Sequence, residues 1–439
     1  MSVDHFLLTK HKNLQVSRLS RVGFLFVIVL IIVVLEGGIR KWISSDLTIP
    51  IIIARDILVF YGIMYAYFTA KLKFENLSLQ VLLLFTFLVI LLGIIQVIVG
   101  LNSVSIFLVG IRFWLLYLWF AFVVGASFSF RDMRAISKLL IWMLLLMTPL
   151  VIIQHFMPPD AFLNKQIEAD DKGVFLVASG IVRVTGTFSF TQGYTTFLAV
   201  ATPIVLAQFI SNVKIWRNKL MPVIAFISLG ISTVLSGSRG SIIYFAIFVF
   251  IYFILLVFYD KKIDVKNKMY GIILFIALGL LISSVFNQSI EANQNRFEDA
   301  SQYESLTGRI AWSIFGTNEM YKNATIIGNG IGMGNNFSSS LLVGERAFLL
   351  SEVEFARTIL EGGVVGFIFV ALKFIVIFLG LKKSWKIFIK NGDILSIMLW
   401  MSVAVAMIFW PIIGQLTVNA FGYLMLGLAL ASLRIQKLK

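Results

Sequence analysis

Two arginines that lie beside glycines are the residues of this sequence best suited to chemistry. Arg239 lies in the short polar stretch Ser236–Ser241, and Arg183 opens the stretch Arg183–Phe188. Arginine stays protonated and binds phosphate oxygens in a two-pronged fashion, and a following helix would add its positive dipole end. The stretch around Arg239 predicts a pyrophosphate-sized anion site, with a plain glycine turn as the alternative. Arg183 alone is equally well explained as an interfacial arginine that extends to lipid headgroups.

A second group of charges lies in Ser351–Gly366. On a helix, Glu354, Arg357 and Glu361 share one face, and charges at the entrance of a membrane span face a cavity or each other. A salt-bridge ladder explains part of this set. The other interpretation is that some of these charges, with Glu352 beside them, face a cavity.

Three further features stand out less. Arg40 and Lys41 follow an apolar run, where Trp42 is an expected interface anchor. Arg55 is followed by Asp56, so it is either self-neutralised or part of a polar cavity. A run of alternating glycines occupies 328–334, but no strand–helix unit follows it, which argues against a dinucleotide site.

Several kinds of chemistry are excluded by what the sequence lacks. It contains no cysteine and only three histidines, so thiol chemistry and a multi-histidine zinc site are not expected. It also lacks a P-loop and the common metalloprotease and nucleophile-elbow motifs. We therefore expect neither a metal nor a cofactor.

The elements that must position these residues are membrane spans. Of the 439 residues, 59% are hydrophobic and only 13% are charged, which indicates an all-α polytopic membrane protein of a single domain, 1–439. Twelve apolar runs are long enough to span a bilayer, at about 22–39, 48–70, 79–99, 106–127, 135–156, 193–211, 220–236, 241–259, 270–287, 353–380, 394–412 and 415–433.

The distribution of charge predicts the topology. With the N-terminus in the cytoplasm, the inner segments carry 23 of the 37 basic residues but only 6 of the 22 acidic residues. The positive-inside rule then places both termini in the cytoplasm. The net charge of +15 is explained by this topology and does not indicate a nucleic-acid partner. Two long loops, about 157–192 and 288–352, fall on the outer face, where function tends to lie.

In their order and spacing, four motifs resemble those of the bacterial O-antigen polymerase and O-antigen ligase superfamily of membrane glycosyltransferases. These motifs are Arg183–Phe188, Ser236–Ser241, Gly328–Gly334 and Glu361–Gly366. The resemblance covers most of the chain. It implies a fold of the membrane glycosyltransferase C type, a place in the bacterial inner membrane with the active site facing the periplasm or cell exterior, and metal-independent transfer.

The resemblance also implies a substrate, an oligosaccharide linked to undecaprenyl diphosphate. By its terms Arg183 and Arg239 bind the lipid diphosphate, and a chain-length regulator is a candidate partner beside membrane lipid. Our mechanistic hypothesis adds Arg357, Arg40 and Arg55 as further residues that bind the diphosphate. Ligases of this family carry a His-Asn pair where this sequence has Glu352 and Val353. That departure favours a polymerase that joins repeat units of a surface polysaccharide with inversion, and leaves a ligase as the alternative.

A function of another class also has to be considered. Twelve spans also suit a secondary transporter or flippase, which often shows two similar halves with ionisable residues at the bilayer midplane. Here the polar residues gather at the outer face and in two unequal loops, which favours the enzyme. In the enzymatic hypothesis Arg239 stabilises the charge of the departing diphosphate, and Glu352 or Glu354 receives the proton of the acceptor hydroxyl.

Overall fold

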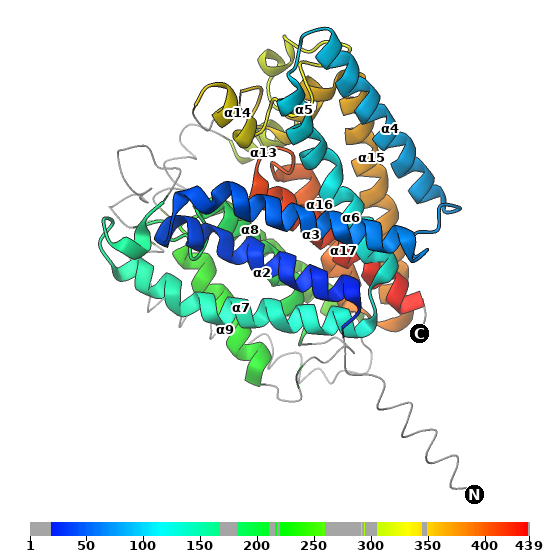
Figure 1. Ribbon diagram of the computed structural model, residues 1–439. Coiled ribbons are helices and arrows are strands. Elements are labelled where there is room, and N and C mark those ends of the chain that lie inside the picture. Colours follow the sequence, from blue (N-terminus) through cyan, green and yellow to red (C-terminus); the bar gives the residue numbers. More distant parts are fainter. Residues whose placement is uncertain are drawn as a thin grey trace, which may run out of the picture.

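A computed structural model shows a bundle of helices with no β-strand among the residues it describes (Figure 1). The described residues are 19–166, 182–209, 216, 220–259, 291, 294, 305–344 and 349–437. Eight helices in this part of the chain are long and apolar enough to cross a membrane, and two shorter apolar helices accompany them. The expected class, an all-α polytopic membrane protein, agrees with this architecture.

The helices fall close to the predicted spans. The first half of the chain contains α2 (Arg21–Trp42), α3 (Thr48–Phe68), α4 (Leu77–Ile98), α5 (Val104–Ile111), α6 (Tyr117–Ser127) and α7 (Phe130–Phe156). The second half contains α8 (Thr191–Ala207), α9 (Leu220–Leu235), α10 (Arg239–Tyr259), α13 (Leu306–Phe315), α14 (Asn336–Leu342), α15 (Glu354–Asn391), α16 (Ile394–Phe409) and α17 (Leu416–Lys437). Short helical turns occupy Ser45–Leu47, Phe162–Asn164 and Asn318–Tyr321. The predicted ninth span, 270–287, lies outside the described residues.

The fourth predicted span contains an irregular turn. Helices α5 and α6 are joined by a π-helical segment, Arg112–Leu116, and together they make one apolar stretch from Val104 to Ser127. A π-turn inserts an extra residue into the helix and shifts the side chains that follow it. This segment carries Arg112 and Trp114, both of which make contacts that join distant parts of the chain.

The tenth predicted span, 353–380, is not one straight helix. Although α15 runs from Glu354 to Asn391, Gly363 has non-helical angles, φ 51° and ψ −127°. The rings of Phe355 and Phe374 lie 5.4 Å apart, whereas nineteen residues of straight helix would separate them by about 28 Å. The chain therefore reverses at Gly363, and Glu354–Gly362 forms a re-entrant helix that packs back along the spanning part of α15.

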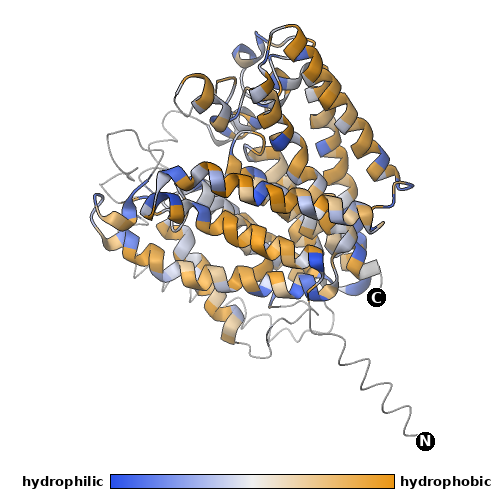
Figure 2. Cartoon of the chain, in the orientation of Figure 1, coloured by the Kyte–Doolittle hydropathy of each residue, from blue (hydrophilic) through white to orange (hydrophobic). Residues whose placement is uncertain are grey.

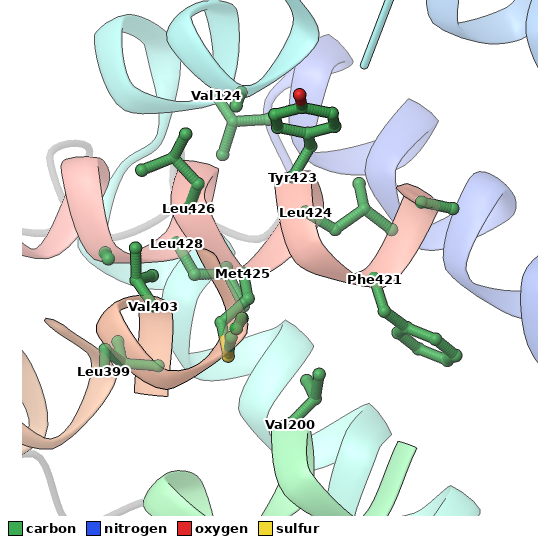
Figure 3. Close-up of a cluster of buried hydrophobic side chains, with 14 of the residues drawn as sticks. Val124, Val200, Leu399, Val403, Phe421, Tyr423, Leu424, Met425, Leu426 and Leu428 are labelled. Atoms are coloured by element: carbon green, nitrogen blue, oxygen red, sulfur yellow. The ribbon is translucent and has the colours of Figure 1, made fainter. Parts of the chain in front are cut away.

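Helix α17 lies at the centre of the bundle. It packs against α6, α16 and α8, and the close-up in Figure 3 shows side chains of α17, such as Phe421 and Leu424, among apolar residues of neighbouring helices. Apolar residues also cover much of the outside of the helices (Figure 2). Large exposed side chains such as Phe60, Phe87 and Phe378 have the position expected of a surface that contacts lipid.

Candidate functional site

A large cavity brings together residues from five parts of the chain. Its volume is about 620 Å³, and its walls come from the segment before α8 and from α8, α10, α13 and the end of α16. Arg183, Arg239 and Arg309 all line it. We call this cavity the arginine pocket. Two of its three arginines, Arg183 and Arg239, are those that the sequence motifs singled out.

The turn before α10 is fixed by its own serines. The hydroxyl of Ser236 lies 2.7 Å from that of Ser241, and Ser241 also donates to the carbonyl of Ser238 at 3.0 Å. Gly237 has a φ of 60°, a value that glycine adopts without strain. Helix α10 then begins at Arg239, so its positive dipole end lies at the wall of the pocket. This arrangement favours a negatively charged ligand.

Arg183 is positioned by a segment that two helices hold in place. The buried ammonium of Lys41 donates to the hydroxyl of Thr185 at 2.9 Å and to the carbonyl of Gly186 at 2.8 Å. Gln154 of α7 accepts from the backbone N–H of Gly186 at 2.8 Å. The guanidinium of Arg183 then reaches the carbonyl of Gly237, 3.5 Å away. The first two motifs therefore meet at the pocket, and Lys41 has a structural explanation.

The arginine pocket has a polar and an apolar side. Thr195 and Thr196 of α8 and Ser313 of α13 contribute hydroxyls to it. Ile243 and Ile247 follow Arg239 along α10, and further apolar residues of the lining are Ala199, Phe248, Ile310, Val405, Phe409 and Trp410. A ligand with a charged group and a long apolar group would find both environments in one cavity.

Arg40 lies elsewhere at this end of the bundle. It lines a second, smaller cavity with Phe188, Gln192, Gln415 and Thr417. Gln192 also lines the arginine pocket, so the two cavities are neighbours. The structure therefore brings Arg40 near Arg183 and Arg239 without placing it in the same cavity.

Glu354 is enclosed by cationic partners. Its carboxylate lies 2.8 Å from the ammonium of Lys373 and 3.2 Å from the guanidinium of Arg357, and it also accepts from the backbone N–H of Ile413 at 3.2 Å. The side chain is almost fully buried, 1% exposed. These partners occupy both carboxylate oxygens, so the geometry gives Glu354 a structural role and offers no access for an acceptor hydroxyl.

Arg357 is also held in the protein interior. It is buried, and its guanidinium donates to the carbonyls of Ser351 at 2.7 Å and Glu352 at 3.0 Å. It lines neither cavity. Glu352 itself lies at the surface, with an exposed side chain. Of the two glutamates predicted as general base, Glu352 is the one whose side chain is exposed, although it lines neither cavity.

Glu361 organises the glycine run. Its carboxylate accepts from the backbone N–H groups of Gly332 at 2.9 Å and Gly334 at 2.8 Å, and from the indole of Trp114 at 2.7 Å. Gly328 packs so closely that a Cβ there would lie 2.3 Å from the carbonyl oxygen of Glu361. The motifs Gly328–Gly334 and Glu361–Gly366 are therefore two halves of one structural unit, which fixes the reversal at Gly363.

Arg55 belongs to a buried ion network. It lies 2.5 Å from Glu36 of α2 and 3.8 Å from Asp56, and Asp56 in turn lies 2.7 Å from Arg112. Arg55 lines neither cavity. The sequence left two interpretations open for Arg55 and Asp56, a self-neutralised pair or part of a polar cavity. The structure shows instead a network of several charges that joins α2, α3 and the π-turn.

Arg309 was not among the residues singled out in the sequence. It lies on α13, inside the long loop predicted at 288–352, and α13 follows residues that the structure does not describe. The periodicity of α13 is a usable signal, because the helix is amphipathic with Arg309 on its polar side. Nothing in the sequence indicated which cavity it would line, since that depends on how the loop folds back.

No group of three or more histidine or acidic side chains gathers in the part of the chain that the structure describes.

Comparisons of the chain with protein-family models, with curated proteins and with solved structures find no match. The geometry of the two cavities is therefore the basis for a functional proposal.

Proposed function

We propose that this protein is a membrane glycosyltransferase that joins undecaprenyl-diphosphate-linked oligosaccharide repeat units into a surface polysaccharide. The observation that carries the proposal is the arginine pocket, where Arg183, Arg239 and Arg309 line one cavity beside the start of α10 and an apolar wall. In this proposal the pocket faces the periplasm or cell exterior, on the outer side of the bacterial inner membrane.

The chemistry of the pocket suits a lipid diphosphate. A diphosphate carries several negative charges, and arginine pairs with phosphate oxygens in a planar, charge-assisted geometry. The N-terminal end of α10 adds a favourable dipole. The isoprenoid chain of the carrier would follow the apolar residues Ile243, Ile247 and Phe248 along α10 toward the membrane. No single motif demands this ligand; the support comes from charge and apolar surface in one cavity.

The proposed reaction forms one glycosidic bond and breaks one bond to diphosphate. The hydroxyl oxygen of the acceptor attacks the anomeric carbon of the lipid-linked sugar, and the bond from that carbon to the diphosphate oxygen breaks with inversion. Arg183, Arg239 and Arg309 stabilise the charge that the departing lipid diphosphate gains. We assign the hydroxyl proton to Glu352 because its side chain is exposed, although it lines neither cavity. Glu354 and Arg357 hold the re-entrant helix.

The decisive experiment compares lipid-linked glycans from cells with and without the gene, by gel electrophoresis and mass spectrometry. We expect the polymer ladder to collapse to a single repeat unit on undecaprenyl diphosphate. The variant Arg239→Gln should reproduce this loss, with a drop of about 10²–10³-fold in the transfer rate. Arg131→Gln, an exposed arginine at the start of α7 that lines neither cavity, is the matched control and should leave the ladder unchanged.

Two other outcomes point to other functions. A full ladder that remains on undecaprenyl diphosphate would indicate a ligase, which moves finished glycan to another acceptor. An unchanged ladder, correctly attached, would contradict both enzymatic functions and support a transporter. The arginine pocket does not separate a polymerase from a ligase, because both use the same lipid-diphosphate donor.

A further inference from the structure

The last turns of α15 carry a row of exposed lysines, Lys382, Lys383, Lys386 and Lys390. Because successive residues of a helix are turned by about 100°, these four lie within little more than a quarter of its circumference. The opposite side of the same turns is buried, with Gly380, Ser384 and Phe388. We call the four lysines the α15 basic face.

The α15 basic face is not neutralised within the part of the protein that the structure describes. The sequence has no acidic residue between Val364 and Gly392. Among the described residues the four lysines form no hydrogen bond, ion pair or ring contact. Other lysines differ in this respect, since the ammonium of Lys138 lies 5.1 Å from the centre of the Trp216 ring. Four positive charges are therefore presented together to a partner outside the described fold.

The same side of α15 is apolar before the lysines begin. Every exposed residue from Val364 to Leu379 is apolar, and Phe378 is 65% exposed. The helix from Val364 to Leu381 is about 27 Å long, close to the thickness of about 30 Å of the hydrocarbon core of a bilayer. The basic face therefore begins where the hydrocarbon ends, at the level of the lipid headgroups.

Two exposed apolar side chains lie among the lysines. Trp385 is 40% exposed and Ile389 is 68% exposed. Tryptophan favours the boundary between membrane and water, and lysine can lay its aliphatic stem along apolar surface while its ammonium reaches the phosphates. This mixture of indole, aliphatic and ammonium groups suits the headgroup region of a lipid layer.

The α15 basic face lies at the opposite end of α16 from the arginine pocket. Helix α16 begins at Ile394, directly after α15, and ends at Phe409, which lines the pocket. This helix is about 24 Å long, so the two sites lie toward opposite surfaces of the membrane. A ligand of the basic face is therefore not the substrate of the arginine pocket.

We propose that the α15 basic face binds the headgroups of anionic phospholipids such as phosphatidylglycerol. Four cations without an acidic residue beside them attract a lipid of net negative charge more strongly than a zwitterionic lipid. The apolar side of α15, which continues directly from the lysines, contacts the acyl chains of the same lipids. This site goes beyond the proposed function and does not depend on it.

The test uses the absence of cysteine from the sequence. Ile389→Cys carries a fluorescent label beside the lysines, and Phe87→Cys carries it on the exposed apolar surface of α4. Each labelled protein is placed in phosphatidylcholine nanodiscs with a small share of phosphatidylglycerol or phosphatidylcholine that bears the same acyl-chain quencher. We expect phosphatidylglycerol to quench the label at position 389 more strongly, and both lipids to quench the label at position 87 equally.

Lys382→Gln/Lys386→Gln should lower this preference for phosphatidylglycerol by up to about fivefold per lysine, and high salt should weaken it. Lys382→Arg/Lys386→Arg keeps the charge and should keep the preference. Lys165→Gln/Lys322→Gln removes the same charge from exposed positions elsewhere, so it is the matched control and should leave the preference unchanged. The unfolding midpoint of each variant in detergent checks that the fold is intact.

Equal quenching of the label at position 389 by the two lipids would overturn the proposal, and so would a preference that survives in Lys382→Gln/Lys386→Gln. A preference that falls just as far in Lys165→Gln/Lys322→Gln would also overturn it, because the effect would then follow the net charge of the whole protein. Equal quenching, combined with protection of the four lysines from an amine-reactive reagent in native membranes, would reject the lipid and identify an acidic protein segment as the partner.

Discussion

The carboxylate of Glu354 lies 2.8 Å from the ammonium of Lys373, although nineteen residues separate them within α15. The reversal at Gly363 makes this contact, and both side chains are buried. A charge buried inside a membrane protein is costly unless it is paired. The pair therefore ties the re-entrant helix to the spanning helix and explains why acids and an arginine gather before a predicted span.

Glu354→Gln should destabilise the protein strongly, because Lys373 and Arg357 would keep their charge without their common partner. Loss of one member of a buried pair costs about 3–5 kcal/mol. The measurement is the thermal unfolding midpoint in detergent. Glu319→Gln is the control, since its partner Lys322 and Glu319 itself are mostly exposed. The double variant Glu354→Gln/Lys373→Met should recover part of the loss. An unchanged midpoint in the single variant would contradict the structural role.

Glu352→Gln should leave the unfolding midpoint unchanged, because the side chain is exposed and the hydrogen bond to Arg357 comes from the backbone carbonyl, which the variant keeps. If Glu352 is the general base, the transfer rate should fall by about 10²–10⁴-fold. The rate is measured as polymer formed from lipid-linked repeat units by purified protein. Glu319→Gln serves again as a control with full activity. Full activity of Glu352→Gln would mean that the proton leaves to water or to another group.

Glu361→Gln should loosen the glycine run without touching either cavity directly. The carboxylate accepts from three N–H groups, and the amide nitrogen of glutamine would face one of these donors instead. An unsatisfied buried donor costs about 1–3 kcal/mol. We expect the unfolding midpoint to fall, but by less than it falls in Glu354→Gln. A midpoint equal to that of the original protein would show that the loop is held without this carboxylate.

Arg55→Gln should lower the stability of the protein and leave its ligand binding unchanged. Glu36 would lose the guanidinium that now lies 2.5 Å away, so the unfolding midpoint should fall. The affinity of the folded protein for undecaprenyl diphosphate should stay the same, because Arg55 lines neither cavity. The double variant Glu36→Gln/Arg55→Met should regain stability. Weaker lipid-diphosphate binding by stable Arg55→Gln protein would restore Arg55 to the substrate site.

Lysine should not replace arginine in the arginine pocket. Arg183→Lys and Arg239→Lys keep the charge but lose the planar fork that matches two phosphate oxygens. We expect both variants to bind undecaprenyl diphosphate about tenfold more weakly, with a smaller loss for the monophosphate. Binding to protein in nanodiscs, compared with Arg131→Lys, measures the effect. If the lysine variants bind undecaprenyl diphosphate as tightly as the original protein does, the two arginines contribute only nonspecific charge to binding.

The sequence by itself was sufficient to predict the class of the protein and the positions of most helices. Long apolar runs are a local property, since each must satisfy its own backbone hydrogen bonds inside a bilayer. The same holds for the turn before α10, where Gly237 and the serines of 236–241 act on neighbours in the chain. Arg183 and Arg239 could be singled out because each lies in a short stretch that contains glycine.

The tertiary structure alone decided what the other charged residues do. In the sequence Glu354, Arg357 and Arg55 are candidates for the site as Arg183 is, because hydropathy does not show which charges pair across helices. The contacts of Glu354 with Lys373 and of Arg55 with Glu36 exist only after the helices pack. Arg309 of α13 lines the same pocket as Arg183 and Arg239, although it lies far from both in the sequence. Such long-range contacts depend on the whole packing arrangement, which no local pattern of residues encodes.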